Sequence, residues 1–339
     1  MHSRPVPEQY VQQANSVFAG ISKPSPDMVE DTPSGEDQAS NFYGVSHFPC
    51  CITNFPQGWP KFAQSAVMAA ADGSASFVVA SLMPLRATVP IGGGATVTVV
   101  IATSYPFGDS AQVSVLVPAS ATTATAHVRI PGWADAATID GAPAANGTLV
   151  AVRCAAGKNT SVLVRLNPAV RLTTGWGVVA DPDDPTEPPT NAMTVTRGAL
   201  LFALHPEEDR HVVHRYDDAL PDRPLAVDYE ISSKESWAFA LLLAGSSPAD
   251  QFTFSASPSS GWSSSFPFDT ENYPFSILAP ARPLSTWGYW EGTNITAQPP
   301  PSPVDCGAPH AGCGAPQQIR LTPFGATNIR ISVWPWVRE

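Results

Sequence analysis

The chain has 339 residues, 36 of them proline, with 43% hydrophobic residues, 14% charged residues and a formal net charge of −11. So few charges argue against a disordered polyelectrolyte, and so many prolines argue against a helical bundle. The negative charge, with no Lys/Arg cluster, argues against nucleic acid as a partner, and no apolar run approaches the roughly 20 residues of a membrane helix.

Two helical patterns are predicted in the first 75 residues. In the segment from Pro7 to Phe18, apolar side chains are spaced to share one helix face. A second helix is expected from Trp59 to Ala71, ended by Asp72-Gly73, because glycine is common just past a helix end. The polar stretch from Lys23 to Ser40 between them predicts an exposed loop.

From Ser76 the hydrophobic period changes to two, which is typical of half-buried strands. Strands are expected at 76–83, 95–104, 111–117, 125–130 and 161–166. Turn signals separate them and no strong helix is interleaved, so residues 76–180 are predicted to form an antiparallel β-sandwich-like domain.

A second β domain is predicted for residues 192–339, after an acidic, proline-rich linker or loop at 181–191. Its expected strands are 192–204, 225–231, 237–243, 318–323 and 327–334. The fold class predicted from the pattern is therefore mainly β.

The adjacent cysteines Cys50 and Cys51 are the strongest candidates for chemistry. One interpretation is two small buried thiols, since free cysteine packs as a small hydrophobe. The other is that both thiolates meet a metal from one loop, with one of them free to attack a substrate. Metal coordination would favour the reactive thiolate.

The other three cysteines suggest no catalytic role. Cys306 and Cys313 lie close together in a Pro/Gly-rich loop and would pair in an oxidising compartment, whereas Cys154, in a polar stretch, is interpreted as an isolated thiol. The localisation is left open: the N-terminus lacks the apolar core of a signal peptide, while sequons at Asn146 and Asn159, with a third at 294, mildly favour secretion.

Several polar and aromatic residues are further candidates for a functional site. His47 is interpreted as a loop histidine near the cysteine pair. The residues interpreted as solvated members of an acidic surface turn, rather than metal ligands, are His205, Glu207, Glu208, Asp209, His211 and His214. The tryptophans that would stack on sugars or, as we expect for most, fill the second β domain are Trp262, Trp287, Trp290, Trp334 and Trp336.

The sequence motifs around the cysteine pair resemble those of glycoside hydrolase family 127, the β-L-arabinofuranosidase-like family. They run from Asn41-Phe-Tyr-Gly44 through Cys50-Cys51-Ile-Thr-Asn54-Phe-Pro-Gln-Gly-Trp-Pro-Lys-Phe62. Further motifs, in the same order along the chain as in the family, extend the resemblance over nearly the whole chain: Tyr10-Val-Gln-Gln-Ala-Asn15, Arg129-Ile-Pro-Gly-Trp133, Thr196-Arg-Gly-Ala-Leu-Leu-Phe202, Trp287-Gly288, Pro300-Pro-Ser-Pro303 and Leu321-Thr-Pro-Phe-Gly325.

The resemblance implies a retaining glycosidase with a zinc-bound cysteine as nucleophile and an arabinofuranoside-type glycan as substrate. By position, Cys50 would be the nucleophile and a zinc ligand, and Cys51 a second zinc ligand. Residues 1–75 would be the C-terminal remnant of a helical toroid catalytic domain, followed by the two β domains. Zinc suits the thiolates, which are ligands it prefers.

The sequence departs from the family pattern upstream of the cysteines. The family's acid/base glutamate and its Glu-x-Cys pair have no counterpart, since Glu8, Glu30 and Glu36 stand in other contexts and no earlier cysteine exists. Two thiolates are fewer than the three or four ligands of a zinc site. We therefore expect no stable zinc binding and no hydrolysis by this chain alone.

Three hypotheses remain open at this stage. The first is the C-terminal fragment of a zinc-dependent glycosidase, the second a non-catalytic β-sandwich protein that binds a glycan or partner, and the third a zinc- or redox-sensitive protein. If the toroid is missing, apolar surface is expected around Phe42, Phe48, Phe55 and Trp59, with poor order before residue 75.

Overall fold

The structure is a computed structural model, which describes residues 8–9, 14–19, 42–43, 57–176, 190–215, 227–257, 267–289, 294, 296–307 and 312–339. The chain divides into two compact units. The nested unit comprises Thr53–Ala169 with Arg197–Ala199, and the large unit comprises Met1–Ile52, Val170–Thr196 and Leu200–Glu339. The sequence of the nested unit is thus inserted into that of the large unit.

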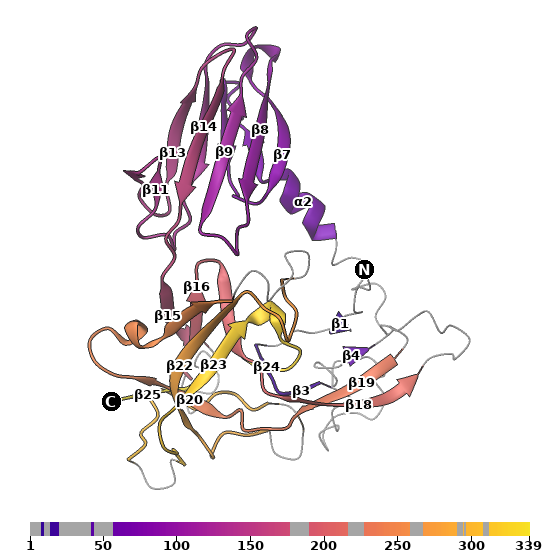
Figure 1. Cartoon of the computed structure of the whole chain (residues 1–339), viewed down its shortest axis with the longest axis vertical. Helices are drawn as coiled ribbons and strands as arrows, with labels where there is room; N and C mark the ends of the chain where they lie inside the picture. Colours follow the sequence, from indigo (N-terminus) through magenta and orange to yellow (C-terminus); the bar gives the residue numbers. More distant parts are fainter. Residues whose placement is uncertain are drawn as a thin grey trace, which may run out of the picture. The chain divides into compact units, whose positions relative to one another are not determined.

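Two sheets form the nested unit. The first has the order β13-β10-β6-β5 and consists of β5 (Val67–Ala69), β6 (Ser76–Val79), β10 (Ala124–Arg129) and β13 (Leu149–Cys154). The second, whose long strands lie side by side in Figure 1, has the order β12-β11-β14-β9-β8-β7. Its strands are β7 (Leu85–Pro90), β8 (Thr96–Thr103), β9 (Ser110–Leu116), β11 (Thr138–Ile139), β12 (Ala142–Pro143) and β14 (Asn159–Arg165).

Alternation of apolar and polar residues turns one face of each sheet toward a shared core. Val97, Val99 and Ile101 of β8 are buried together with Ala126 and Val128 of β10, from the other sheet. Full burial of a valine or isoleucine side chain stabilises the folded state by about 1.5–3 kcal/mol. The five strands predicted between residues 76 and 166 are confirmed, and β7, β11, β12 and β13 were missed. The predicted wholly antiparallel arrangement is wrong at one place, because β10 pairs with β6 in parallel.

The helix predicted from Trp59 to Ala71 is shorter in the structure, where α2 spans Gly58–Gln64. Pro60 is tolerated because the first turn of a helix leaves its N–H groups unpaired in any case. The Ser65 hydroxyl bonds back to the Lys61 carbonyl at 3.0 Å, and the chain then enters β5, whose Val67 pairs with Val79. Strand pairing therefore displaced the second half of the expected helix.

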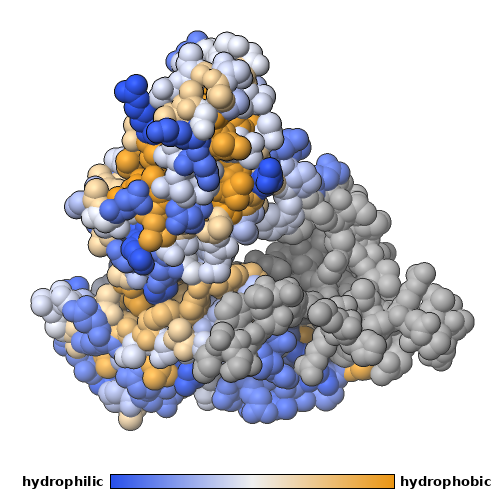
Figure 2. Space-filling model, turned by 45° about the horizontal axis from the view of Figure 1, so that its top comes forward, coloured by the Kyte–Doolittle hydropathy of each residue, from blue (hydrophilic) through white to orange (hydrophobic). Residues whose placement is uncertain are grey.

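The surface of the nested unit mixes polar side chains with apolar ones, as the orange and blue atoms in the upper part of Figure 2 show. Leu116 and Leu149 are about half exposed. Trp59 is 63% exposed and Phe62 is 50% exposed, and α2 has no buried residue. The expected exposed apolar surface is confirmed at Trp59, whereas Phe48 and Phe55 lie outside the described residues.

The large unit contains two further sheets in the described part of the chain. One has the order β1-β4-β19-β18, with β3 also paired to β19. It consists of β1 (Glu8–Gln9), β3 (Phe18–Ala19), β4 (Phe42–Tyr43), β18 (Glu208–Arg215) and β19 (Val227–Ser233).

The other sheet follows β15-β16-β17-β23-β22-β20-β25, with β24 on β17, β2 on β24 and β21 on β22. Its strands are β2 (Asn15–Ser16), β15 (Val170–Trp176), β16 (Ala192–Arg197), β17 (Leu200–Leu204), β20 (Phe239–Leu243), β21 (Thr253–Ala256), β22 (Phe275–Pro283), β23 (Gln317–Pro323), β24 (Arg330–Ile331) and β25 (Trp336–Arg338). The run expected as one strand at 192–204 is a hairpin turning at Gly198, whose φ of +60° favours glycine.

The helix predicted from Pro7 to Phe18 is wrong, because this segment supplies strands β1, β2 and β3. The Asn15 side chain accepts hydrogen bonds from the backbone N–H groups of Ser332 and Val333 at 3.0 and 2.9 Å and donates to the Val333 carbonyl at 2.7 Å. Val17 and Ala19 are fully buried. Residues 14–19 are therefore packed into the large unit, while the poor order expected before residue 75 stays a prediction.

The mainly β fold class is confirmed, and the described residues 1–75 add only α2 and short strands. The expected linker at 181–191 lies largely outside the described residues, and the four-part domain division stays a prediction. Within the described ranges, no helix is both long and apolar enough to cross a membrane.

Candidate functional site

The predicted nucleophile Cys50 and its neighbour Cys51 lie outside the described residues, as does His47. Described elements precede and follow them. Upstream, β4 pairs with β1 through Phe42 and Gln9 and with β19 through Phe42 and Tyr229. Downstream, α2 begins at Gly58. The roles assigned to the two cysteines therefore stay predictions.

The most developed polar site in the described structure surrounds Glu208, the first residue of β18. One carboxylate oxygen contacts His205 Nε2 at 2.6 Å. The other accepts hydrogen bonds from Arg210 Nε and, at 3.2 Å, from Asn328 Nδ2. The Glu208 side chain is only 7% exposed, so the expectation that His205 and Glu208 are solvated turn residues is wrong. These residues, with Arg330, are called the Glu208 cluster below.

Arg330 supplies the buried cation of the Glu208 cluster. Its guanidinium bonds to the Thr327 hydroxyl and carbonyl at 2.8 and 3.0 Å, and it lies 4.7 Å from the centre of the Phe324 ring. Burial lowers the pKa of Arg330 to about 10, while the charge of Glu208 acts in the opposite direction. Arg330 is thus still charged at neutral pH and offsets the buried carboxylate.

Hydrogen bonding keeps Glu208 ionised. Burial alone would raise its pKa, but the hydrogen bond and charge of His205 and the contacts of Arg210 outweigh that effect and hold the pKa below its ordinary value. A carboxylate that is ionised at neutral pH and engaged on both oxygens is poorly suited to act as a general acid. The cluster therefore joins β17, β18 and β24 rather than forming a catalytic pair.

Three further residues of the expected acidic turn, Glu207, Asp209 and His211, are solvated as predicted. Asp209 and His211 form an exposed pair at 3.1 Å. Glu207, whose side chain is 69% exposed, contacts Lys234 at 3.2 Å. No group of three His, Cys, Asp or Glu residues that could hold a metal occurs among the described residues.

Three of the candidate tryptophans pack in the interior of the large unit, as expected for most of them. Trp287, Trp334 and Trp336 are buried. The indole of Trp287 donates to the Ala297 carbonyl and that of Trp336 to the Asn191 carbonyl, both at 3.0 Å. Trp262 and Trp290 lie outside the described residues. Three of the proposed sugar-stacking platforms are thus core residues.

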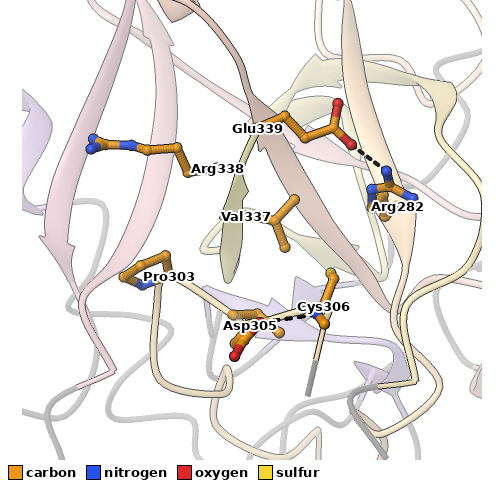
Figure 3. A pocket seen from close by; sticks show the side chains of 9 residues that line it. Arg282, Pro303, Asp305, Cys306, Val337, Arg338 and Glu339 are labelled. Carbon is orange, nitrogen blue, oxygen red and sulfur yellow. Dashed lines mark hydrogen bonds and ion pairs between the residues drawn. The ribbon is translucent and has the colours of Figure 1, made fainter. Parts of the chain in front are cut away.

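Sequence reasoning missed a cavity of about 310 Å³ in the large unit, shown in Figure 3. Its lining residues come from the end of β22, from β25 and from the adjoining loop and C-terminal residue: Arg282, Pro303, Val304, Asp305, Cys306, Gly307, Val337, Arg338 and Glu339. The signal in the sequence was the Cys306/Cys313 pair, which forms a disulfide with a Cα–Cα distance of 5.6 Å.

Comparisons with known proteins find matches among solved structures alone. No protein-family model matches the sequence, and no curated protein matches it. One solved match is described as a glycoside hydrolase, with a TM-score of 0.52 and 16% identity over 89% of this chain.

Two further matches are family 127 enzymes. One is a GH127 β-L-arabinofuranosidase from Geobacillus stearothermophilus T6, with a TM-score of 0.52 and 14% identity over 95% of this chain. The other is the GH127 β-arabinofuranosidase BT3674, with a TM-score of 0.50 and 12% identity over 89%. The chain spans 42–46% of the length of the three matched structures. The fold of this chain is therefore that of part of a family 127 glycoside hydrolase, as the sequence resemblance predicted.

Proposed function

We propose that this chain is the C-terminal part of a retaining glycoside hydrolase of the β-L-arabinofuranosidase type, with Cys50 as its nucleophile. The observation that carries the proposal is the fold shared with family 127 enzymes over 89–95% of the chain. The sequence motifs that this chain shares with the family are the reason for choosing Cys50, within Cys50-Cys51, as the nucleophile.

The proposed chemistry is a double displacement. The Cys50 thiolate attacks the anomeric carbon, the bond to the leaving oxygen breaks, and a general acid protonates that oxygen. Water then displaces the cysteine sulfur and gives its proton to the same residue acting as base. Two inversions restore the configuration at the anomeric carbon.

The chain alone lacks two parts of this machinery. No upstream glutamate stands in the context of the family's acid/base residue. In the family that the sequence resembles, zinc would keep the nucleophile deprotonated, with Cys50 and Cys51 as two of its ligands, but two cysteines of one loop fall short of the three or four ligands of a zinc site. We therefore expect this chain alone to bind zinc without stability and to be inactive.

The test compares this chain with the product of its full-length transcript, sequenced 5′ of Met1. The chain alone should not hydrolyse 4-nitrophenyl β-L-arabinofuranoside above the rate of a Cys50→Ser variant. If the transcript reads in frame into a helical stretch with Glu-x-Cys, its product should be active. Cys50→Ser should then lower kcat/KM by at least roughly 10³-fold.

Cys154→Ala is the matched control, because Cys154 is fully buried in the core of the nested unit. In the longer protein it should leave kcat/KM within about twofold. Turnover by the 339-residue chain alone would contradict the expected incompleteness. Activity that survives Cys50→Ser in the longer protein would contradict the assigned nucleophile.

A second candidate function is glycan binding without catalysis by the β domains. The cavity beside Arg282 favours it, since it combines an apolar wall with charged groups that can hydrogen-bond hydroxyls.

A further inference from the structure

Backbone hydrogen bonds hold strand β25, which forms one wall of the cavity of the large unit, on both of its sides. On one side β25 pairs in parallel with β20, matching Val337 to Leu242. On its other side the Val304 N–H donates to the Trp336 carbonyl at 2.8 Å, which holds the loop that carries Pro303 to Gly307 along this edge.

The disulfide secures the far end of this loop. Cys306 is joined to Cys313, which forms a bridge with Leu284 just after β22. The next residue, Gly314, donates its N–H to the Pro283 carbonyl at 2.8 Å and accepts a hydrogen bond from Arg282 at 3.0 Å. The lining groups are therefore held before any ligand arrives, which lowers the entropy cost of binding.

The four charged side chains that line the cavity balance one another. Arg282 and Arg338 contribute two positive charges, and Asp305 and Glu339 two negative ones. Figure 3 shows Val337 between an Arg282–Glu339 ion pair on one side and Pro303, Asp305 and Cys306 on the other. The Asp305 carboxylate is oriented by the Gly307 N–H at 2.9 Å.

We propose that this cavity binds a neutral, polyhydroxylated ligand, specifically a single sugar unit. Hydroxyl groups both donate and accept hydrogen bonds, so a sugar can donate to the carboxylates and accept from the guanidinium groups at the same time. The two guanidinium groups and two carboxylates offset one another, so the lining side chains give neither an anion nor a cation a net electrostatic advantage, whereas Pro303, Val304 and Val337 suit the C–H face of a ring. A volume of about 310 Å³ lies at the small end of ligand pockets, about 300–1,000 Å³. The choice of a sugar among polyols rests on the proposed function.

The experiment titrates the intact, oxidised chain with L-arabinose, glycerol, inorganic phosphate and spermidine, observed by saturation-transfer NMR and calorimetry. We expect saturable L-arabinose binding with a dissociation constant on the order of 1 mM, because a sugar of roughly ten non-hydrogen atoms makes few contacts. Binding of glycerol, phosphate and spermidine should be at least about tenfold weaker.

Two variants identify the site. Asp305→Asn retains an oxygen for the Gly307 N–H but removes the charge, and Glu339→Gln does the same at the opposite wall. Each should weaken L-arabinose binding by about tenfold, because a hydrogen bond to a charged group is lost. Each should also strengthen phosphate binding, since one negative charge is removed from the lining of the cavity. Asp72→Asn is the matched control, because its carboxylate also accepts a backbone N–H two residues later, at 2.9 Å from Ser74, in the nested unit.

Three results would overturn the proposal: no saturable sugar binding, sugar binding unchanged in both variants, or tighter binding of phosphate than of L-arabinose by the unaltered chain. Its failure is separable from that of the proposed hydrolase function. Sugar binding is measured on this chain without turnover, whereas the Cys50→Ser comparison is measured as hydrolysis by the longer protein.

Discussion

Among single residues, Glu208 connects the stability of the large unit to pH. Its folded-state pKa lies below the ordinary value of 4.5. A carboxyl with a depressed folded pKa binds its proton more readily in the unfolded chain. The stabilisation it provides is therefore present above about pH 4.5 and is lost as the pH falls through the lower folded value.

We predict that Glu208→Gln lowers the free energy of unfolding of the large unit at pH 7 by about 3 kcal/mol. The substitution removes a charge buried opposite Arg330 and Arg210, and breaking such a buried pair is costly. Urea unfolding followed by tryptophan fluorescence measures the change. As the pH falls below about 4.5 the difference between the two proteins should shrink, because the Glu208 carboxylate takes up its proton first in the unfolded chain and then, at lower pH, in the folded protein.

Asp209→Asn is the matched control, since this neighbouring carboxylate is 45% exposed. We expect it to change the unfolding free energy by no more than about 0.5 kcal/mol. A pH dependence of Glu208→Gln identical to that of the unaltered protein would contradict the assignment of the acid-sensitive group.

At the scale of an element, the short strand β2 is held in place mainly by the hydrogen bonds of one side chain, that of Asn15. Strand β2 has two residues, and Asn15 adds three side-chain hydrogen bonds to the backbone of residues 332 and 333. Asn15→Ala should therefore lower the unfolding free energy by about 2–3 kcal/mol, because the N–H and carbonyl groups of Val333 lose these partners and the Ser332 N–H keeps only its bond to the Ala14 carbonyl.

Hydrogen exchange is the measurement that checks this effect, since protection of the Ser332 and Val333 amides should fall selectively. Asn146→Ala removes two exposed side-chain hydrogen bonds in the nested unit and should cost less than about 1 kcal/mol. Unchanged protection at residues 332 and 333 in the Asn15 variant would show that the strand is held by other contacts.

At the scale of the whole molecule, the two units should differ in their response to reductant. The Cys306–Cys313 disulfide belongs to the large unit, and the described cysteine of the nested unit, Cys154, is a buried free thiol. Closing a loop of about eight residues stabilises a fold by roughly 2 kcal/mol.

Reduction should thus lower the Tm of the large unit and leave that of the nested unit unchanged, as calorimetry with and without phosphine reductant would show. Burial raises the pKa of the Cys154 thiol, so iodoacetamide should label it only after unfolding. Rapid labelling of Cys154 in the native protein, or an equal loss of Tm in both units, would contradict this division.

The sequence was most informative where local pattern and final packing agree. Val97, Val99 and Ile101 alternate with outward-facing residues, so the period-two signal located β8 and its neighbours correctly. Strand β22 was missed because Pro280 and Pro283 argue against a sheet interior, yet it pairs with both β20 and β23.

The predictions from sequence that were most in error concern residues whose hydrogen-bond partners lie far away in the chain. The apolar spacing near Tyr10 and Val17 fits a helix, but the hydrogen bonds that decide the matter for Asn15 come from residues more than 300 positions away. Glu208 likewise looks like one acid among several, and its burial depends on Asn328 and Arg330. No local pattern carries such information, because propensity is overridden by tertiary contacts.

The pairing of β2 with β24 sets an order of events during synthesis. Asn15 leaves the ribosome well before its partner Val333, which lies 318 positions later in the chain. The nested unit is contiguous apart from three residues and can form while translation continues. The β2 segment must instead wait for its distant partner strand, so the large unit can be completed only after the main segment of the nested unit has been translated.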